Sequence, residues 1–334
     1  MQRDKGISYT RVIAMIFILT DHIVMKIDIP FKSVIIQITN TGVLIFLFIS
    51  GFLYGRKEID DFKQWFIKRA KKILIPLYVF MIFLIIIQVI NKEGINWVSY
   101  FKYLINMQGL LGVIQGAVHL WFLTALMLCY LITPLLQKGK KIANNINFKE
   151  IVLIFILSSI IQIVCAYFIN IKFALGHSLS TYLIYIFAYI FGYYYSYYNQ
   201  GKEINNKKMI IFTFIMIISM IIRVISNKLI DGTILYDRII SMQTNLIFAI
   251  YISILIKKYY ILVNCKKIEK IINNLDALSF EIYIVHGISI EIFMNVTNNI
   301  VINVVSTLIS AYIIAFLFKK ICSFVNRIFL VERI

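Results

Sequence analysis

The stretch Arg11-Val-Ile-Ala-Met-Ile-Phe-Ile-Leu-Thr-Asp21-His22 places three ionisable side chains in an otherwise apolar segment. On an α-helix, eleven residues return to nearly the same face, so Arg11 and His22 share one face and lie about 16 Å apart along the axis. Asp21 lies about 100° away from that face. An ionisable residue inside a membrane helix is energetically costly and therefore indicates a functional site. We expect one elongated ligand to lie along the face between Arg11 and His22.

The composition identifies a membrane protein. The chain has 334 residues, of which 60% are hydrophobic and only 15% are charged. Its mean hydropathy of +0.84 is far above the average for soluble domains. Its four cysteines have neither a Cys-x-x-Cys pair nor another metal-ligand spacing, so no disulfide framework and no zinc site are predicted. The first apolar stretch continues into Asp-His rather than into a small-residue cleavage site, which favours a retained helix over a signal peptide.

Ten segments are long and apolar enough to cross a bilayer, which requires about 20 residues. They are residues 7–25, 34–54, 73–90, 119–136, 151–169, 181–198, 209–225, 239–256, 275–293 and 300–321. The intervening segment 94–118 carries several aromatic residues and three glycines near its end, and we expect an interfacial or re-entrant element there. The predicted fold class is therefore all-α: a polytopic bundle of about ten transmembrane helices that forms one domain over residues 1–334, with no soluble domain.

Lysines and arginines distinguish the two ends of these segments. One end of the bundle holds 25 of the 34 basic residues and the other holds 7, which by the positive-inside rule predicts that both termini are cytoplasmic. The net charge of +18 then reflects topology and attraction to anionic lipid, so no nucleic-acid partner is expected. Heavy use of isoleucine, lysine and asparagine is typical of an AT-rich bacterial genome. We therefore expect a multi-pass protein of a bacterial plasma membrane.

This orientation assigns a depth to the remaining polar residues. Arg11 then lies near the cytoplasmic surface, and Trp121 lies at the outer start of the fourth span. Tyr283 precedes His286 by one turn on the same helix face. Histidines at an interface are commonly amphipathic residues satisfied by water, but a histidine inside a span favours a functional site. All four histidines fall on the outer side: His22, His119, His177 and His286.

Two further segments lie towards the cytoplasmic side. The second span ends in Ser50-Gly51-Phe52, where small residues indicate either close helix packing or a passage for a ligand chain between helices. The segment 65–76 contains Lys68, Arg69, Lys71 and Lys72. These charges either anchor the third span or form a phosphate-binding patch at a helix entrance.

These residues resemble the signature of the integral-membrane acyltransferase 3 family. One departure is that Lys72 stands where the family has a second arginine, which keeps the charge but loses bidentate phosphate geometry. The resemblance extends from residue 11 to residue 286 in five ordered motifs: Arg11-x10-His22; Gly42-Val-Leu-Ile-Phe46-Leu-Phe48-Ile-Ser50-Gly51-Phe52; Phe66-x2-Arg69-x2-Lys72-Ile-x2-Pro76-x-Tyr78; His119-Leu-Trp121 with Pro134; and Ser279-x3-Tyr283-x2-His286.

The resemblance implies a membrane O-acyltransferase, most often of acetyl groups. Such an enzyme moves the acyl group from cytoplasmic acyl-CoA, a co-substrate, to a hydroxyl of a cell-surface polysaccharide or a lipid-linked glycan. His22 would act as general base, since imidazole titrates near neutral pH, and an acyl-His22 intermediate is the less favoured variant. No metal and no bound cofactor are required. The implied residues are His22 and Arg11 for catalysis, Arg69, Lys72, Ser50 and Gly51 for the donor, and His119, Trp121, Tyr283 and His286 for the acceptor.

Two other classes of protein remain open from the sequence. A transporter of a small molecule or lipid-linked glycan would use Arg11 and His22 as a substrate or proton site. Inverted repeats are typical of transporters, and the sequence shows none clearly. A non-catalytic membrane partner of glycan-synthesis proteins would not require the two residues to share a helix face. Transfer of acetyl from acetyl-CoA by the purified protein separates the enzyme from both.

Overall fold

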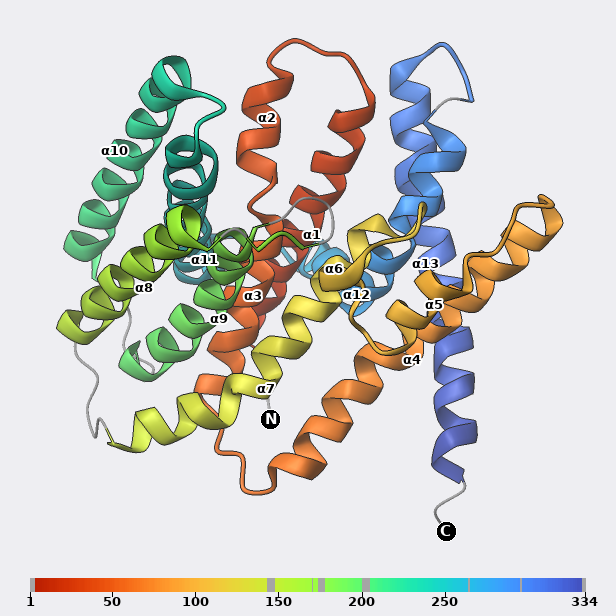
Figure 1. Ribbon diagram of the computed structural model, residues 1–334, viewed down its shortest axis with the longest axis horizontal. Helices are drawn as coiled ribbons and strands as arrows, with labels where there is room; N and C mark the ends of the chain where they lie inside the picture. The colour runs from red at the N-terminus through yellow and green to blue at the C-terminus, as the bar shows by residue number, and fades with distance from the viewer. Residues whose placement is uncertain are drawn as a thin grey trace.

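Helices form nearly all the regular structure of the protein (Figure 1). The computed structural model describes residues 4–142, 148–169, 171–173, 178–199, 205–263, 265–294 and 296–331. Within these ranges there is no strand, only an isolated bridge between Lys172 and Ser178, so the predicted all-α class is confirmed. The main helices are α1 (Lys5–Lys26), α2 (Lys32–Thr39), α3 (Gly42–Gly55), α4 (Phe62–Ile90), α5 (Trp97–Leu104), α6 (Gln108–Leu111), α7 (Trp121–Ile142), α8 (Phe148–Phe168), α9 (Leu179–Asn199), α10 (Asn206–Ile230), α11 (Ser241–Tyr259), α12 (Lys266–Phe293) and α13 (Ile300–Val331).

Three short elements complete the described helices. The 3-10 turn η1 (Val118–Leu120) leads into α7, the π-helix η3 (Leu235–Ile240) leads into α11, and the 3-10 turn η4 (Tyr260–Leu262) follows it. One end of the bundle carries most of the lysines and arginines. At this end lie the last residues of α3, α7, α9 and α11 and the first residues of α1, α4, α10 and α12. We call this the basic end of the bundle.

Eight of the ten predicted spans are confirmed as helices long and apolar enough to cross a membrane. The other two predicted spans form α9, which is rich in tyrosine, and α12, which contains Asp276, Glu281 and Glu291; neither is among the candidate spans of the described residues. Whether α9 and α12 cross the membrane, and on which side the termini lie, stay predictions. The eight candidate spans are Lys5–Lys26, Lys32–Gly55, Phe62–Ile90, Val118–Lys141, Lys149–Phe168, Asn206–Ile230, Leu235–Leu262 and Ile300–Ile328.

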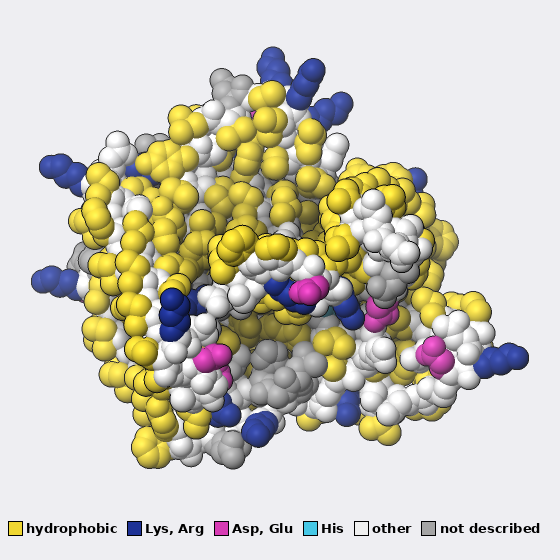
Figure 2. Space-filling model, turned by 90° about the horizontal axis from the view of Figure 1, so that it is seen from above, with side chains coloured by type: hydrophobic (Ala, Val, Ile, Leu, Met, Phe, Trp, Pro, Cys, Tyr) yellow, Lys and Arg dark blue, Asp and Glu magenta, His cyan; other side chains and the backbone are white. Residues whose placement is uncertain are grey.

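The surface of the bundle suits a lipid environment. Helices α8, α10 and α13 expose isoleucines along their length, including Ile160, Ile218 and Ile309. Viewed from above, hydrophobic side chains cover much of the visible rim, and charged side chains are scattered among them (Figure 2). A bilayer solvates such apolar faces, so they need no further protein to cover them.

The segment 94–118 folds into short helices beside α4 and α7, at the end of the bundle opposite the basic end. Trp97 and Phe101 of α5 are exposed, whereas Tyr100 and Tyr103 are buried. The Tyr103 hydroxyl donates to the carbonyl of Ala117 at 3.0 Å and accepts from a backbone N–H. Exposed aromatic rings on one side of a short helix are typical of an element lying at a membrane interface.

Helices α3 and α9 pack with their backbones nearly in contact. A Cβ atom added at Gly51 would collide with the backbone of Tyr189 in α9, and one added at Gly192 would collide with the backbone of Phe48 in α3. Gly42 similarly allows α3 to approach α1. Small residues permit this close packing of membrane helices, and they fix α1, α3 and α9 as the centre of the bundle.

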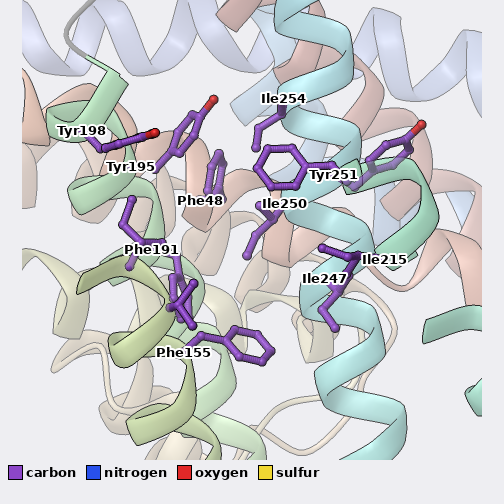
Figure 3. Close-up of a pocket in the computed structure, with 13 residues that line it drawn as sticks. Phe48, Phe155, Phe191, Tyr195, Tyr198, Ile215, Ile247, Ile250, Tyr251 and Ile254 are labelled. Carbon is purple, nitrogen blue, oxygen red and sulfur yellow. The ribbon is translucent and has the colours of Figure 1, made fainter. Parts of the chain in front are cut away.

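An apolar pocket of about 240 Å³ lies between α3, α8, α9, α10 and α11 (Figure 3). Its described lining residues are all aliphatic or aromatic, and they include Phe48, Phe155, Phe191, Ile247 and Ile250. We call this the apolar pocket. It lies on the side of α3 that carries Phe48.

Candidate active site

A polar cavity of about 460 Å³ lies near the basic end, among α1, α3, α4, α7, α12 and α13. We call it the polar cavity. Arg11, Ser50, Arg69 and Lys72, four of the residues predicted from the sequence, line it together with Lys319. Among its described lining residues there are therefore four cationic side chains, and the one carboxylate is that of Glu281. Such an excess of cations favours an anionic ligand.

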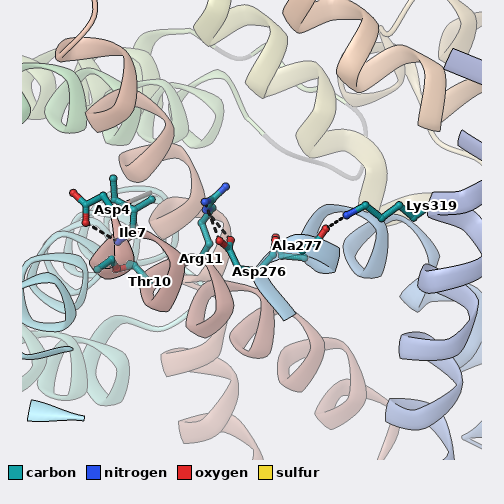
Figure 4. Close-up of polar contacts among 9 residues, drawn as sticks. Asp4, Ile7, Thr10, Arg11, Asp276, Ala277 and Lys319 are labelled. Atoms are coloured by element: carbon teal, nitrogen blue, oxygen red, sulfur yellow. Dashed lines mark hydrogen bonds and ion pairs between the residues drawn. The ribbon is translucent and has the colours of Figure 1, made fainter. Parts of the chain in front are cut away.

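Arg11 reaches the polar cavity from α1 and is held by Asp276 of α12 (Figure 4). The Nε of Arg11 lies 3.0 Å from Oδ1 of Asp276, and Nη2 donates to Oδ2 at 3.1 Å. The Asp276 side chain is fully buried, whereas 31% of the Arg11 side chain is exposed. A two-point pair of this kind fixes the plane of the guanidinium group as well as its position.

Arg69 and Lys72 lie one turn apart near the start of α4. The Arg69 guanidinium carbon lies 5.2 Å from the centre of the Tyr54 ring, a cation–π arrangement that restrains the side chain at the cavity wall. The Tyr54 ring is packed edge-on by Trp65 and Tyr130. The basic segment of α4 therefore faces the polar cavity on an aromatic support.

The two small residues at the end of the second predicted span have different surroundings. Ser50 lines the polar cavity. Gly51 is buried against the backbone of Tyr189 in α9 and is not among the described lining residues of that cavity. Consecutive helix residues point about 100° apart, which explains why one faces the cavity and the other the α9 contact.

Three histidines from distant parts of the chain meet in the half of the bundle opposite the basic end. The rings of His22 (α1) and His286 (α12) are stacked, with centroids 5.0 Å apart and planes 8° apart. The His119 ring, from η1, lies 4.4 Å from that of His286 and 6.4 Å from that of His22. His119 and His286 are buried, whereas 32% of the His22 side chain is exposed. We call these three residues the histidine cluster.

Backbone carbonyls orient two of the rings. His119 Nε2 lies 2.9 Å from the carbonyl oxygen of Ile284, and His286 Nδ1 lies 2.6 Å from that of Tyr283. A carbonyl only accepts hydrogen bonds, so these two nitrogens carry the protons. In neutral rings the opposite nitrogens then carry lone pairs. His286 Nε2 is buried and has no hydrogen-bond partner among the described residues.

The surroundings of the histidine cluster include Asp21. Its Oδ1 accepts a hydrogen bond of 3.2 Å from the Thr39 hydroxyl, and its Oδ2 lies 3.9 Å from His22 Nδ1. The carboxylate thus extends further towards His22 than the position of Asp21 on the helix indicates, although it makes no hydrogen bond to the imidazole. Within the described ranges, no group of three or more His, Cys, Asp and Glu residues has the arrangement of a metal site.

A single layer of aromatic side chains separates the polar cavity from the histidine cluster. Tyr283 and Phe122 line the cavity, and their rings are 5.3 Å apart. The Tyr283 ring also lies 5.6 Å from that of His119 and 5.7 Å from that of His286, and its hydroxyl donates to the His119 carbonyl. Tyr283 therefore touches the cavity on one side and the histidines on the other.

Of the residues predicted to bind the acceptor, His119, Tyr283 and His286 are in mutual contact. Trp121 packs instead against α9, where its ring is 4.8 Å from that of Tyr185 and 5.9 Å from that of Tyr182. His177 lies outside the described residues. Asp276 and Lys319 belong to none of the five motifs, and their signal in the sequence is a charged residue within a long, mostly apolar segment.

The family comparison covers both parts of this site. Residues 4–320, nearly the whole chain, match the family model of the acyltransferase domain (Acyl_transf_3). No curated protein and no solved structure matches the chain significantly. The match confirms the resemblance drawn from the five motifs, and the eight apolar helices indicate a multi-pass membrane protein. The chain therefore belongs to the acyltransferase domain family.

Proposed function

We propose that the protein is a membrane O-acyltransferase that takes an acyl group, most often acetyl, from acyl-CoA in the polar cavity. The acceptor is a hydroxyl of a cell-surface polysaccharide or a lipid-linked glycan, bound at the histidine cluster. The observation that carries this proposal is the pairing of a cation-lined cavity with a histidine cluster across one aromatic layer. Arg11 and His22, on one face of α1, connect the two parts.

The donor fits the charge of the polar cavity. CoA carries its phosphates at the nucleotide end and its thioester at the far end of a long, uncharged arm. Arg69 and Lys72 supply charge-assisted hydrogen bonds for phosphate oxygens, and Arg11 is already oriented by Asp276. A cavity of about 460 Å³ lies within the range of roughly 300–1,000 Å³ typical of small-molecule sites. The arm would extend along α1 towards Tyr283.

His22 is the general base in this scheme because it is the accessible member of the histidine cluster. Its imidazole takes the proton of the acceptor hydroxyl as that oxygen attacks the thioester carbonyl. The new C–O bond forms, the C–S bond breaks, and the proton passes from His22 to the departing CoA thiolate. Stacking on His286 holds the His22 ring in one orientation, which is the kind of pre-arrangement that general base catalysis requires.

The acceptor side is supported by aromatic side chains. Trp121, which follows His119 by two residues, forms an aromatic group with Tyr182 and Tyr185. Aromatic rings commonly pack against the apolar faces of sugars, and the lone pair of His286 Nε2 provides a buried hydrogen-bond acceptor for a hydroxyl. We expect the acceptor to arrive from the side opposite the basic end, in a bacterial plasma membrane where glycan-synthesis proteins are potential partners.

The test is acyl transfer by the purified protein in lipid nanodiscs. Release of free CoA from acetyl-CoA in the presence of a glycan acceptor supports the proposal, and acceptor-dependent transfer should be lost in His22→Ala. In cells, NMR of surface glycans should show O-acetyl groups that disappear on deletion and return with the wild-type gene. Binding or uptake of a substrate without any cleavage of the thioester would instead identify a transporter.

A further inference from the structure

Helix α13 forms one wall of the polar cavity, although none of the five motifs lies on it. Its lining residues are spaced as one face of a helix, and they are Lys319, Cys322, Ser323 and Asn326. Asn326 lies seven residues, or about 10 Å, closer to the basic end than Lys319. The α13 wall therefore extends over about 10 Å along the cavity towards the basic end.

Lys319 is also anchored by α12, but through a backbone carbonyl rather than through a carboxylate. Its Nζ donates to the carbonyl oxygen of Ala277, the residue after Asp276 (Figure 4). Asp276 and Ala277 thus fix two cations, one from α1 and one from α13, that both line the polar cavity. An ammonium group has three N–H donors, so the bond to one carbonyl leaves donors for a ligand.

The neighbouring lysine shows that this placement is specific. Lys320 is exposed, and its Nζ lies 4.5 Å from the centre of the Phe316 ring, away from the cavity lining. The two consecutive lysines therefore face different surroundings. A cation within a membrane helix is energetically costly unless it interacts with a partner or a ligand. Glu281 on α12 is close enough to interact electrostatically with Lys319.

We infer that Lys319 binds a phosphate of the CoA nucleotide, so that α13 contributes to donor recognition together with Arg69 and Lys72 of α4. This inference rests on the proposed function and names a further binding residue for the same site. The apolar end of the cavity, at Phe122 and Tyr283, suits the acyl arm, which leaves the lysine side for the phosphates. The cavity cations outnumber the nearby acids, Asp276 and Glu281, as a multiply charged anion requires.

Equilibrium binding to protein in neutral-lipid nanodiscs tests this inference without depending on turnover. The ligands are CoA, 3′-dephospho-CoA and pantetheine, and the variants are Lys319→Met, Lys319→Arg and the matched control Lys320→Met. Loss of one charge-assisted hydrogen bond should weaken CoA binding about 10-fold in Lys319→Met. Pantetheine binding should not change. Lys319→Arg should retain most of the affinity, and Lys320→Met should bind CoA like the wild type.

The outcomes separate this inference from the proposed function. An equal loss of affinity for CoA and pantetheine in Lys319→Met, or no loss at all, would overturn the role of Lys319 alone. Tight CoA binding by the wild type without acyl transfer would overturn the proposed function but leave Lys319 as a phosphate ligand. Wild-type protein that does not bind CoA would overturn both. A smaller defect with 3′-dephospho-CoA than with CoA would assign Lys319 to the 3′-phosphate.

Discussion

The polar cavity and the apolar pocket lie on two sides of α3, and their linings have opposite chemistry. Phe46, Ile49 and Ser50 face the polar cavity, whereas Phe48 faces the apolar pocket. None of the described residues that line the apolar pocket is charged, and the pocket is compatible with lipid chains. The polar cavity keeps four cations within a membrane protein, and insertion of each such residue at a bilayer centre costs roughly 2.5–3.5 kcal/mol. The comparison teaches that a costly, charged lining distinguishes a site that binds a polar ligand from a space that lipid chains can fill.

The largest effect on acyl transfer is expected from a substitution of His22, which lies near the end of α1 and outside the polar cavity. His22→Ala should lower acyl transfer by about 10²–10⁴-fold, the usual contribution of a general base. CoA affinity should change less than about 2-fold, because His22 is not among the described lining residues of the cavity. The rate of CoA release measures acyl transfer, and equilibrium binding measures the affinity for CoA. Full transfer by a well-folded His22→Ala protein would rule out its role as base.

Arg69→Ala removes a cation from the polar cavity itself. We expect CoA affinity to fall about 10–100-fold, since a hydrogen bond to a charged group contributes about 1.5–3 kcal/mol. The matched control is Lys68→Ala, whose side chain is exposed and is not among the described lining residues. Competition binding with CoA measures both. Equal affinities of the two variants would remove the distinction between the polar cavity and an ordinary basic surface.

Asp276→Asn tests whether the cavity cations depend on their anchors. The change removes the carboxylate that holds Arg11 and should destabilise the protein by about 1–3 kcal/mol, since a partly buried charge loses its partner. In Arg11→Gln/Asp276→Asn, part of that stability should return while acyl transfer stays low. Stability is measured in detergent as the loss of monodisperse protein on heating. Comparing the wild type, the two single variants and the double variant then gives the double-mutant cycle. Additive losses of stability would show that the two residues act independently.

The smallest effect is expected on the other side of α3. Ile247→Trp fills part of the apolar pocket, and acyl transfer should stay within about 2-fold of the wild type because no proposed step uses this pocket. The change in stability should stay within about 2 kcal/mol in either direction, because filling the pocket stabilises the protein and any overpacking opposes this. Initial rates and thermal unfolding provide the measurements. A decrease in transfer of 10-fold or more would show that the apolar pocket belongs to the working site.

Helical spacing and charge distribution made part of this structure predictable from the sequence. The common face of Arg11 and His22 depends only on local helix geometry. Eight spans follow from apolar length, but α9 and α12 show the limit of this signal. Asp276 of α12 and several tyrosines of α9, among them Tyr182 and Tyr189, are buried inside the bundle, where neighbouring helices provide hydrogen bonds and an ion pair that hydropathy does not register.

The partners within the site could not be predicted because they are distant in sequence. The spacing of Tyr283 and His286 indicated a shared face, but not that His286 stacks on His22. Lys319 counted among the basic residues of the cytoplasmic side, whereas the structure places it on the wall of the polar cavity. Gly51 and Ser50 belong to one motif, and only the position of α9 distinguishes their surroundings.

The ion pair between Arg11 and Asp276 also constrains how the protein is made. The two residues are 265 positions apart, so at about 5–20 residues per second the ribosome completes α12 some tens of seconds after α1. During that interval α1 resides in the membrane before its acidic partner exists. Arg11 lies two turns from the start of α1, where a long side chain can extend to the headgroups. The arginine can therefore serve first as a topological anchor at the lipid surface and become part of the polar cavity only after α12 has been made.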